Sequence, residues 1–429
     1  MNAGDTAWIL VSVALVLLMT PGLAFFYAGL VRETNVVNTL KMSFIAMGLI
    51  AVEWALVGYS MTFAEGSSLL GGLDFLGLEG VGGQPEPALA DNIPHLAFMA
   101  FQMMFAIITP ALISGAVVGR MKFKAYTAFI LLWSLLVYNP IAHWVWGPGG
   151  WIGELGALDF AGGTVVHVSA GVSALVAALM LGPRRREGQS VSEDDEAPHN
   201  VPLVVLGASL LWFGWFGFNA GSALAADGLA ATAFVTTMLS AAAAVVAWVG
   251  IDLAARRKPG AVGASIAAVV GLVAITPAAG FVTPLSAMAI GSISAATSYL
   301  AVSVLKYTRL DDTLDVFACH GIGGIVGSVL TGIFASTVVN PDGAAGLLSG
   351  NVDLLGVQVL SVVVTGAWAA LGTALILAGL RVVMSLRPDD DEVARGIDLI
   401  EHAEVAYALE PALDVLVRRR LATLTDDRS

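Results

Sequence analysis

The sequence has few charged residues and almost no cysteine. Only 12% of its 429 residues are Asp, Glu, Lys or Arg, whereas 57% are hydrophobic. Soluble globular chains carry about 25% charged residues. A chain with this composition is too apolar to cover a water-facing surface with polar groups, which excludes a soluble enzyme. Cys319 is the single cysteine, so an intrachain disulfide and a multi-cysteine metal site are excluded as well.

Basic residues are also scarce. The chain has 20 Lys and Arg against 33 Asp and Glu, and its net charge of −13 argues against nucleic acid as a partner. No basic segment precedes the first apolar run, so we expect this run to be a retained spanning helix rather than a cleaved leader. The alternating segments of a transmembrane β-barrel are absent, because the apolar runs are unbroken.

What the sequence contains instead is a series of long apolar runs. A helix needs about 20 apolar residues to cross the core of a bilayer. The runs predict an all-α integral membrane protein with eleven transmembrane helices. We place them at about 7–31, 40–63, 95–119, 124–144, 161–182, 200–219, 228–254, 262–279, 282–306, 318–337 and 354–386.

The basic residues predict the orientation of these helices. With eleven crossings, all 20 Lys and Arg fall on one side of the membrane, which places the N-terminus outside and the C-terminus in the cytoplasm. The opposite loops carry acids and no basic residue, so the outer face mildly favours cations over anions. These acids are Glu65, Asp74, Glu79, Glu86, Asp91, Glu154, Asp159, Asp227, Asp342 and Asp353.

Two of the six histidines lie inside apolar helices. His167 and His320 each follow an aspartate by eight residues, Asp159 and Asp312. Eight helical residues rise about 12 Å, and half the hydrocarbon core is about 15 Å thick. Because the two helices run in opposite directions, each histidine is predicted to reach the bilayer midplane from its own side. This pattern predicts an inverted five-plus-five repeat with the eleventh helix left over.

Two ionisable groups that meet at the midplane indicate a functional site. Adjacent imidazoles resist double protonation, but one can donate a hydrogen bond to the other. Such a pair suits a weak base that can release its proton. The alternative is two separate histidines, each bonded to a backbone carbonyl, with no pore. For the other four, His95, His143, His199 and His402, we expect solvated or interfacial side chains.

Aromatic residues gather at the predicted outer ends of helices. Trp146, Phe105 and Ser222 either belong to an interfacial belt or converge at an outer opening, where a tryptophan face binds a cation with about 0.5–2 kcal/mol. Glu53 is the one clear intramembrane acid. We expect it to be protonated and to hydrogen-bond between helices or between subunits.

Several long motifs resemble the ammonium transporter (Amt/MEP/Rh) family, specifically its bacterial Amt branch. They are MTPGLAFFYAGLVR (19–32), YNPIAHWVWGPGG (138–150), LDFAGGTVVHVSAG (158–171), GWFGFNAGSA (214–223) and DDTLDVFACHGIGGIVG (311–327). The resemblance covers about residues 5–407. It implies a homotrimer in the cytoplasmic membrane, with one pore in each eleven-helix subunit. One departure is Cys319, where we expect a small apolar residue beside His320.

The resemblance also assigns roles to residues of this chain. An outer ammonium-recruitment site is matched by Trp146, Phe105, Ser222 and Phe101, and a gate of stacked phenyl rings by Phe105 and Phe218. The pore lumen is matched by His167, His320 and Trp215. Structural and supporting positions are matched by Asp159, Tyr138 and Asp312. No catalytic residue, metal ligand or cofactor is implied.

The sequence divides into a membrane domain, 1–386, and a cytoplasmic regulatory tail, 387–429. The membrane domain comprises repeat halves at about 7–182 and 200–337 and helix 11 at 354–386. In the tail, RGIDLIEHAEVAYA (395–408) resembles the segment through which PII-type signalling proteins act on cytoplasmic loops and tail.

The resemblance implies transport of ammonium or ammonia, with methylammonium as a possible further substrate. The alternative is an ammonium sensor that signals through the tail. An intramembrane enzyme is disfavoured because HExxH and GxSxG motifs are absent. A sodium-coupled carrier is disfavoured because no carboxylate cluster accompanies Glu53. Conduction of urea or carbon dioxide through an apolar pore stays open.

Overall fold

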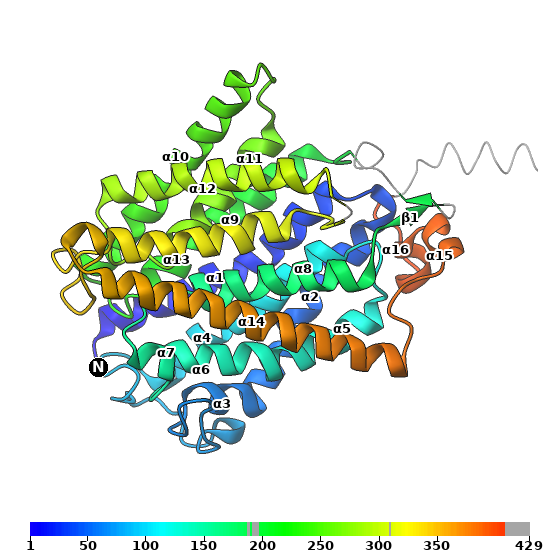
Figure 1. Ribbon diagram of the computed structural model, residues 1–429. Helices are drawn as coiled ribbons and strands as arrows, with labels where there is room; N and C mark the ends of the chain where they lie inside the picture. Colours follow the sequence, from blue (N-terminus) through cyan, green and yellow to red (C-terminus); the bar gives the residue numbers. More distant parts are fainter. Residues whose placement is uncertain (187–188, 191–196, 309, 408–429) are drawn as a thin grey trace, which may run out of the picture.

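The computed structural model describes residues 1–186, 189–190, 197–308 and 310–407 (Figure 1). Its helices lie side by side in one bundle. In chain order the principal helices are α1 (Ala3–Leu30), α2 (Val36–Glu53), α3 (Tyr59–Phe63), α4 (His95–Val117), α5 (Phe123–Trp133), α6 (Asn139–Trp146), α7 (Trp151–Glu154), α8 (Ser169–Leu181), α9 (Val201–Gly221), α10 (Gly228–Ala254), α11 (Ala261–Ile275), α12 (Pro284–Leu305), α13 (Ile322–Phe334), α14 (Val352–Val383), α15 (Asp390–Arg395) and α16 (Ile397–His402).

In the part of the chain that the structure describes, four π-helical segments interrupt or begin these helices, and three short 3₁₀ turns lie between them. A π-helical turn adds one residue to the usual hydrogen-bonded ring and is frequent at functional sites. The π segments are η2 (Trp54–Gly58), η4 (Ser134–Tyr138), η5 (Gly163–Val168) and η7 (Phe317–Gly321), and the 3₁₀ turns are η1 (Glu33–Asn35), η3 (Leu76–Leu78) and η8 (Leu347–Ser349).

The described residues contain ten helices long and apolar enough to cross a membrane, which makes this a multi-pass membrane protein. The predicted span at 262–279 is the exception. Helix α11 has only 15 residues, and residues 267–275 are all buried. This helix packs inside the bundle against α10, α12 and α9 instead of facing outward. Pro277 follows closely and lacks the N–H that a continuing helix needs.

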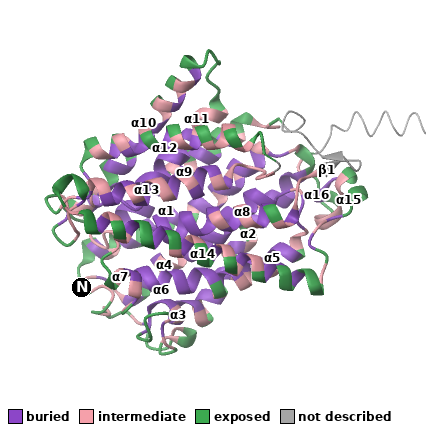
Figure 2. Cartoon of the chain, viewed as in Figure 1, coloured by how far each residue is buried: buried purple, intermediate pink, exposed green. Residues whose placement is uncertain are grey.

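Helix α4 lies at the centre of the bundle and α12 lies at its edge. In the apolar 18-residue stretch of each helix, 78% of the residues of α4 are buried, against 28% of those of α12. Figure 2 colours the chain by this burial. The N-terminus and the short helices α15 and α16 lie at opposite ends of the bundle (Figure 1).

Residues 184–199 form a charged stretch between the fifth and sixth predicted spans, and their described part includes two short strands. Strands β1 (Arg185–Arg186) and β2 (Gln189–Ser190) pair antiparallel over two residues each. Residues 187–188 and 191–196 of this stretch lie outside the described residues, as do residues 408–429 of the predicted tail.

The described part of the tail is anchored to the bundle. Asp398 on α16 accepts hydrogen bonds from the backbone N–H groups of Val37 (2.9 Å) and Asn38 (2.8 Å) in the first turn of α2. This carboxylate satisfies amides that have no partner within their own helix. His199 provides a second contact between the tail and the bundle. Its ring nitrogens lie 2.7 Å from the Val31 carbonyl oxygen and 2.8 Å from the Tyr407 hydroxyl.

Two histidines that we expected to be solvated or interfacial are buried. His95 is 3% exposed and its Nε2 lies 2.5 Å from the hydroxyl of Tyr59, and His143 is fully buried between the carbonyl oxygens of Thr62 and Ser67. The prediction was wrong for both residues. They lie at helix ends, as the sequence indicates, but the long segment that follows α3 folds back over them.

A buried cluster of ion pairs connects three segments of the chain at the end of the bundle near α15. The guanidinium of Arg120, which is 1% exposed, lies 3.2 Å from the carboxylate of Asp311 and also donates to the carbonyl of Gly182. Arg184 makes a second ion pair with Asp311 at 3.0 Å. Asp311 precedes η7, so the cluster ties the segment that leads to His320 to the ends of α4 and α8.

We expect Asp311→Asn to lower the free energy of unfolding by about 3 kcal/mol at neutral pH, because it leaves Arg120 buried without its charge partner. Burial raises the pKa of Asp311, but Arg120 and Arg184 outweigh this effect and hold the pKa below the ordinary value of 3.8. The stabilisation is therefore complete above pH 3.8 and is lost as the pH falls through the lowered folded-state pKa.

Thermal unfolding of the detergent-solubilised protein at pH 7 and at pH 3 checks this prediction. The difference between wild type and Asp311→Asn is expected to shrink at pH 3. Equal stability of the two proteins at pH 7 would contradict the assigned role of the ion cluster.

Candidate functional site

The two histidines predicted to form a pair lie on π-helical segments that cross each other closely. His167 belongs to η5 and His320 to η7. A Cβ atom added at Gly171 would come within 2.1 Å of the backbone nitrogen of Gly321, and one at Gly324 within 2.9 Å of the Gly163 carbonyl. Because both glycines lack side chains, the two backbones approach close enough for the imidazoles to face each other.

The imidazoles stack and are joined by a hydrogen bond. Their ring centroids lie 5.3 Å apart with an interplanar angle of 27°, and the two Nδ1 atoms are 3.3 Å apart. One Nδ1 must therefore carry a proton while the other accepts. Among the described residues Nε2 of His167 has no hydrogen-bond partner although it is buried. A small polar molecule in the passage can form the bond that this nitrogen lacks.

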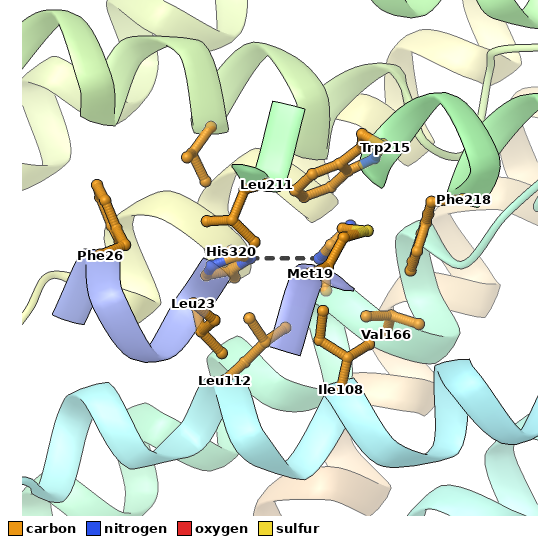
Figure 3. Close-up of a pocket in the computed structure, with 12 residues that line it drawn as sticks. Met19, Leu23, Phe26, Ile108, Leu112, Val166, Leu211, Trp215, Phe218 and His320 are labelled. Atoms are coloured by element: carbon orange, nitrogen blue, oxygen red, sulfur yellow. Dashed lines mark hydrogen bonds between the residues drawn. The ribbon is translucent and has the colours of Figure 1, made fainter. Parts of the chain in front are cut away.

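The histidine pair lines a narrow apolar cavity of about 10 Å³, close to the space of one water-sized molecule (Figure 3). Trp215 stacks on His167 at 5.5 Å between ring centroids, and its indole N–H donates to Thr276 at 3.0 Å, which fixes the ring. The other lining residues are apolar or aromatic: Met19, Leu23, Phe26, Ile108, Leu112, Val166, Leu211, Phe218 and Val269.

A larger cavity of about 360 Å³ opens on the other side of Phe105. It is lined by all four residues of the predicted recruitment site, Trp146, Phe105, Ser222 and Phe101. The ring of Trp146 stands edge to face against Phe105 at 5.8 Å. The Ser222 hydroxyl donates to the Phe218 carbonyl at 2.9 Å, which leaves the lone pairs of its oxygen available to a donor in the cavity.

Two phenyl rings separate the cavities. Phe105 lines the larger cavity and Phe218 the smaller one, and their ring centroids lie only 4.3 Å apart. Phe218 in turn lies 6.2 Å from His167. The rings therefore form a continuous series from the outer cavity to the histidine pair, and a molecule that passes between the cavities must displace a phenyl ring.

Asp159 organises the backbone that carries His167. Its carboxylate accepts five hydrogen bonds, at 2.5–3.2 Å, from the backbone N–H groups of residues 162–165 and the Thr164 hydroxyl. Its own carbonyl accepts from the Trp146 indole at 2.9 Å. Asp312 has the corresponding place before His320, where it accepts from the Phe317 N–H at 2.6 Å. Both aspartates are thus helix caps, since they satisfy the first amides of the histidine segments.

Comparison with known proteins identifies the family of the chain. A model described as the Ammonium Transporter Family matches residues 7–407. The chain belongs to this family.

The relatives span nearly the whole chain. An ammonium transporter of Bacillus subtilis is 47% identical over 95% of this chain and 99% of its own length. Among solved structures, Saccharomyces cerevisiae Mep2 superposes with a TM-score of 0.83 at 37% identity, covering 91% of this chain and 88% of Mep2. A structure described as a sensor Amt protein gives a TM-score of 0.84 at 31% identity, covering 93% and 98% of the two chains.

Tyr138, which the resemblance assigns a supporting position, and Cys319, which departs from the family pattern, both lie away from the cavities. Tyr138 is fully buried, with its ring 6.3 Å from that of Trp54 and 6.4 Å from that of Trp133, and it lines neither cavity. Cys319, although next to His320, packs into an apolar cluster with residues of α10, α11 and α12 and lines neither cavity.

Glu53 forms a buried polar cluster between helices. Its carboxyl group accepts from the Ser134 hydroxyl at 3.0 Å and from the Asn139 amide at 2.9 Å. A Cβ atom at Gly58 would meet its carboxyl oxygen at 2.6 Å, so this glycine makes room for the acid. Of the two partners expected, a helix of the same subunit is therefore the one observed. Neither partner is charged, so these contacts place no cation beside the Glu53 carboxyl group.

We expect Glu53→Gln to leave both stability and transport unchanged, because an amide has the shape and hydrogen-bonding capacity of the neutral acid. Glu53→Leu is expected to lower the free energy of unfolding by about 1–3 kcal/mol, since two buried donors lose their acceptor. Thermal unfolding of the two variants in detergent checks this. If Glu53→Gln lowered the free energy of unfolding as much as Glu53→Leu, the result would contradict a neutral carboxyl group.

Two polar residues near the outer cavity were not found from the sequence. Gln102 lines the cavity one turn before Phe105. Asn92 donates to the Asp5 carboxylate (2.9 Å) and to the Leu224 carbonyl (2.8 Å), which holds the turn after Ser222. Spacing on the helix of Phe105 could have identified Gln102. No local signal links Asn92 to residues 87 and 132 positions away in the chain.

Proposed function

We propose that the chain transports ammonium or ammonia across the cytoplasmic membrane. NH4+ binds in the outer cavity at Trp146 and Ser222 and loses its proton near the phenyl pair Phe105 and Phe218. NH3 then moves past the histidine pair and is protonated again inside. The observation that carries the proposal is the histidine pair itself, in a narrow apolar cavity beyond the phenyl rings.

The physical basis is the cost of moving a charge through an apolar passage. An intact cation loses its hydration there, and the effective penalty is several kcal/mol or more for each ion. Potassium carries the same charge and cannot lose it. Ammonium can release a proton and enter as neutral NH3. The Nε2 atom of His167, which is buried without a partner among the described residues, offers a hydrogen bond along the way.

The outer cavity supplies attraction for the cation before it is deprotonated. The Trp146 ring offers a cation–π contact of about 0.5–2 kcal/mol, and the Ser222 oxygen accepts a hydrogen bond that ammonium can donate and potassium cannot. Asp159 is a support rather than a ligand in this proposal, because five hydrogen bonds from the chain already occupy its carboxylate.

We extend the proposal to the organisation of the protein. The membrane domain, 1–386, assembles as a homotrimer in the cytoplasmic membrane, with eleven crossings per subunit and the N-terminus outside. Its halves, 7–182 and 200–337, form an inverted repeat, which the matching positions of Asp159 and Asp312 before the two histidines support. The tail, 387–429, lies in the cytoplasm, where a PII-type signalling protein binds it together with the cytoplasmic loops.

Sensing is the second candidate function, and the similarity to a sensor Amt protein favours it. Deletion of residues 387–429 separates the two functions. A transporter is expected to keep its flux when the tail is removed, whereas a sensor that uses the tail loses its signalling. If deletion of the tail abolished signalling and the intact protein showed no flux, the result would support the sensor.

Uptake of labelled methylammonium into proteoliposomes tests the proposed function. We expect uptake above that of protein-free liposomes, and competition by ammonium. Electrical current recorded at the same time separates passage of NH3 from net movement of NH4+. Uptake no greater than in protein-free liposomes would overturn the proposal.

A further inference from the structure

Helix α14 has no residue in either cavity, yet one of its side chains reaches toward the outer site. Gln358 is 1% exposed and its carboxamide makes three hydrogen bonds to main-chain atoms of other elements. Its Oε1 accepts from the Leu158 N–H at 2.8 Å, and its Nε2 donates to the Leu158 carbonyl at 2.8 Å and to the Ser328 carbonyl at 3.1 Å.

These partners fix the orientation of the amide group. One neighbour is a donor and two are acceptors, so only one of the two amide orientations satisfies all three. The contact with Leu158 engages both the N–H and the carbonyl of one residue, as in the pairing of two strand residues. Both main-chain polar groups of Leu158 are therefore bonded to α14, whereas the N–H groups of Ala157 and Phe160 bond to the carbonyls of Ile152 and Pro277.

Leu158 directly precedes Asp159, and both residues line the outer cavity. The Asp159 carbonyl holds the Trp146 indole at 2.9 Å, and the Asp159 carboxylate caps the segment that carries His167. An error in the position of Leu158 would consequently shift the acceptor that sets the orientation of the Trp146 ring. Ser328 lies on α13, the helix that continues from His320, so the same amide also relates the two halves of the site.

We propose that Gln358 is a positioning residue of the outer site: it holds the loop at 157–160 so that the Trp146 ring faces the incoming cation. This inference rests on the proposed function, which makes Trp146 part of the recruitment site. Gln358 touches no substrate, and it acts through Leu158 and Asp159.

Gln358→Met tests this role, because methionine has similar length and volume but cannot make the three hydrogen bonds. Methylammonium uptake into proteoliposomes is expected to show a half-saturation concentration about fivefold higher, with the maximal rate lowered less than twofold, since one site of recruitment is misplaced and the histidine pair is intact. Thr373→Val on the same helix is the matched control. Thr373 bonds to Ser173 and Trp133, far along α14 from Leu158, and its loss should not change the half-saturation concentration.

A double-mutant cycle with Trp146→Leu separates positioning from general destabilisation. If Gln358 acts through Trp146, adding Gln358→Met to Trp146→Leu changes the half-saturation concentration less than twofold. A fivefold increase in both backgrounds, or no increase in the wild-type background, would overturn the inference.

Hydrogen exchange gives a readout that does not depend on transport. In Gln358→Met, the amides of the loop at 157–160 should exchange at least about tenfold faster than in wild type, because the loop loses its hydrogen bonds to α14, whereas Thr373→Val should leave them unchanged. Unchanged exchange in Gln358→Met would refute the role of Gln358. Absence of uptake by the wild type would refute the proposed function while the exchange result still decides whether Gln358 holds the loop.

Discussion

Replacing both pore histidines, His167→Ala with His320→Ala, is expected to reduce methylammonium uptake about 100-fold or more. In the native pore the imidazoles supply the polar atoms of an otherwise apolar cavity. Without them a neutral amine enters with its hydrogen-bonding capacity unsatisfied, at a cost of about 1–3 kcal/mol for each missing bond. Two such losses correspond to a factor of about 100 in rate. Initial uptake rates in proteoliposomes measure this change.

Cys319→Ala is the matched control for the histidine variants. The side chain of Cys319 is buried one residue before His320 but packs against α10, α11 and α12, away from the pore. We expect wild-type uptake from this variant. If the double histidine variant kept the rate and the selectivity of the wild type, the histidines would have no role in the passage.

The second large effect is expected from Asp159→Ala. This change removes the acceptor of five hydrogen bonds and leaves the backbone amides at 162–165 buried without partners. We expect a loss of about 3–5 kcal/mol in the free energy of unfolding and uptake below detection, since His167 and the Trp146 ring both lose their support. Thermal unfolding and uptake of the same preparation measure the two consequences together.

Asp227→Ala provides the comparison for Asp159. Asp227 is also a carboxylate at a helix start, but it makes a single cap hydrogen bond, to the Ala230 N–H at 2.9 Å, and it is exposed. Asp227→Ala should lower the free energy of unfolding by about 1 kcal/mol and leave uptake unchanged. Asp159→Ala that folds with wild-type stability and transports at the wild-type rate would show that the cap is dispensable.

The sequence predicts features whose signal is local. Long apolar runs locate the membrane helices, and the spacing of eight residues from aspartate to histidine marks the two segments that meet at the histidine pair. The helix found in the run at 262–279 covers only Ala261–Ile275, which is shorter than the other ten apolar helices. The positions of His95 and His143 at helix ends gave no indication that a following segment covers them.

Features that depend on partners distant in the chain could not be predicted. Glu53 is recognisable as a buried acid, but its partners Ser134 and Asn139 lie 81 and 86 positions away. Gln358 and Leu158 are separated by 200 positions, and a single glutamine in an apolar helix has no pattern that names its acceptor. The resemblance to ammonium transporters supplied roles for the pore residues, and the structure adds the contacts that hold them in place.

The central claim is that ammonium loses its charge before it passes the histidine pair. A comparison of ammonium and potassium flux through the wild-type protein in the same proteoliposomes tests it most directly. Because the two ions carry the same charge and only ammonium can release a proton, we predict ammonium flux at least about 100-fold greater, equivalent to about 3 kcal/mol of discrimination. Potassium flux comparable to that of ammonium would contradict the account, since it would show that intact cations cross the apolar passage.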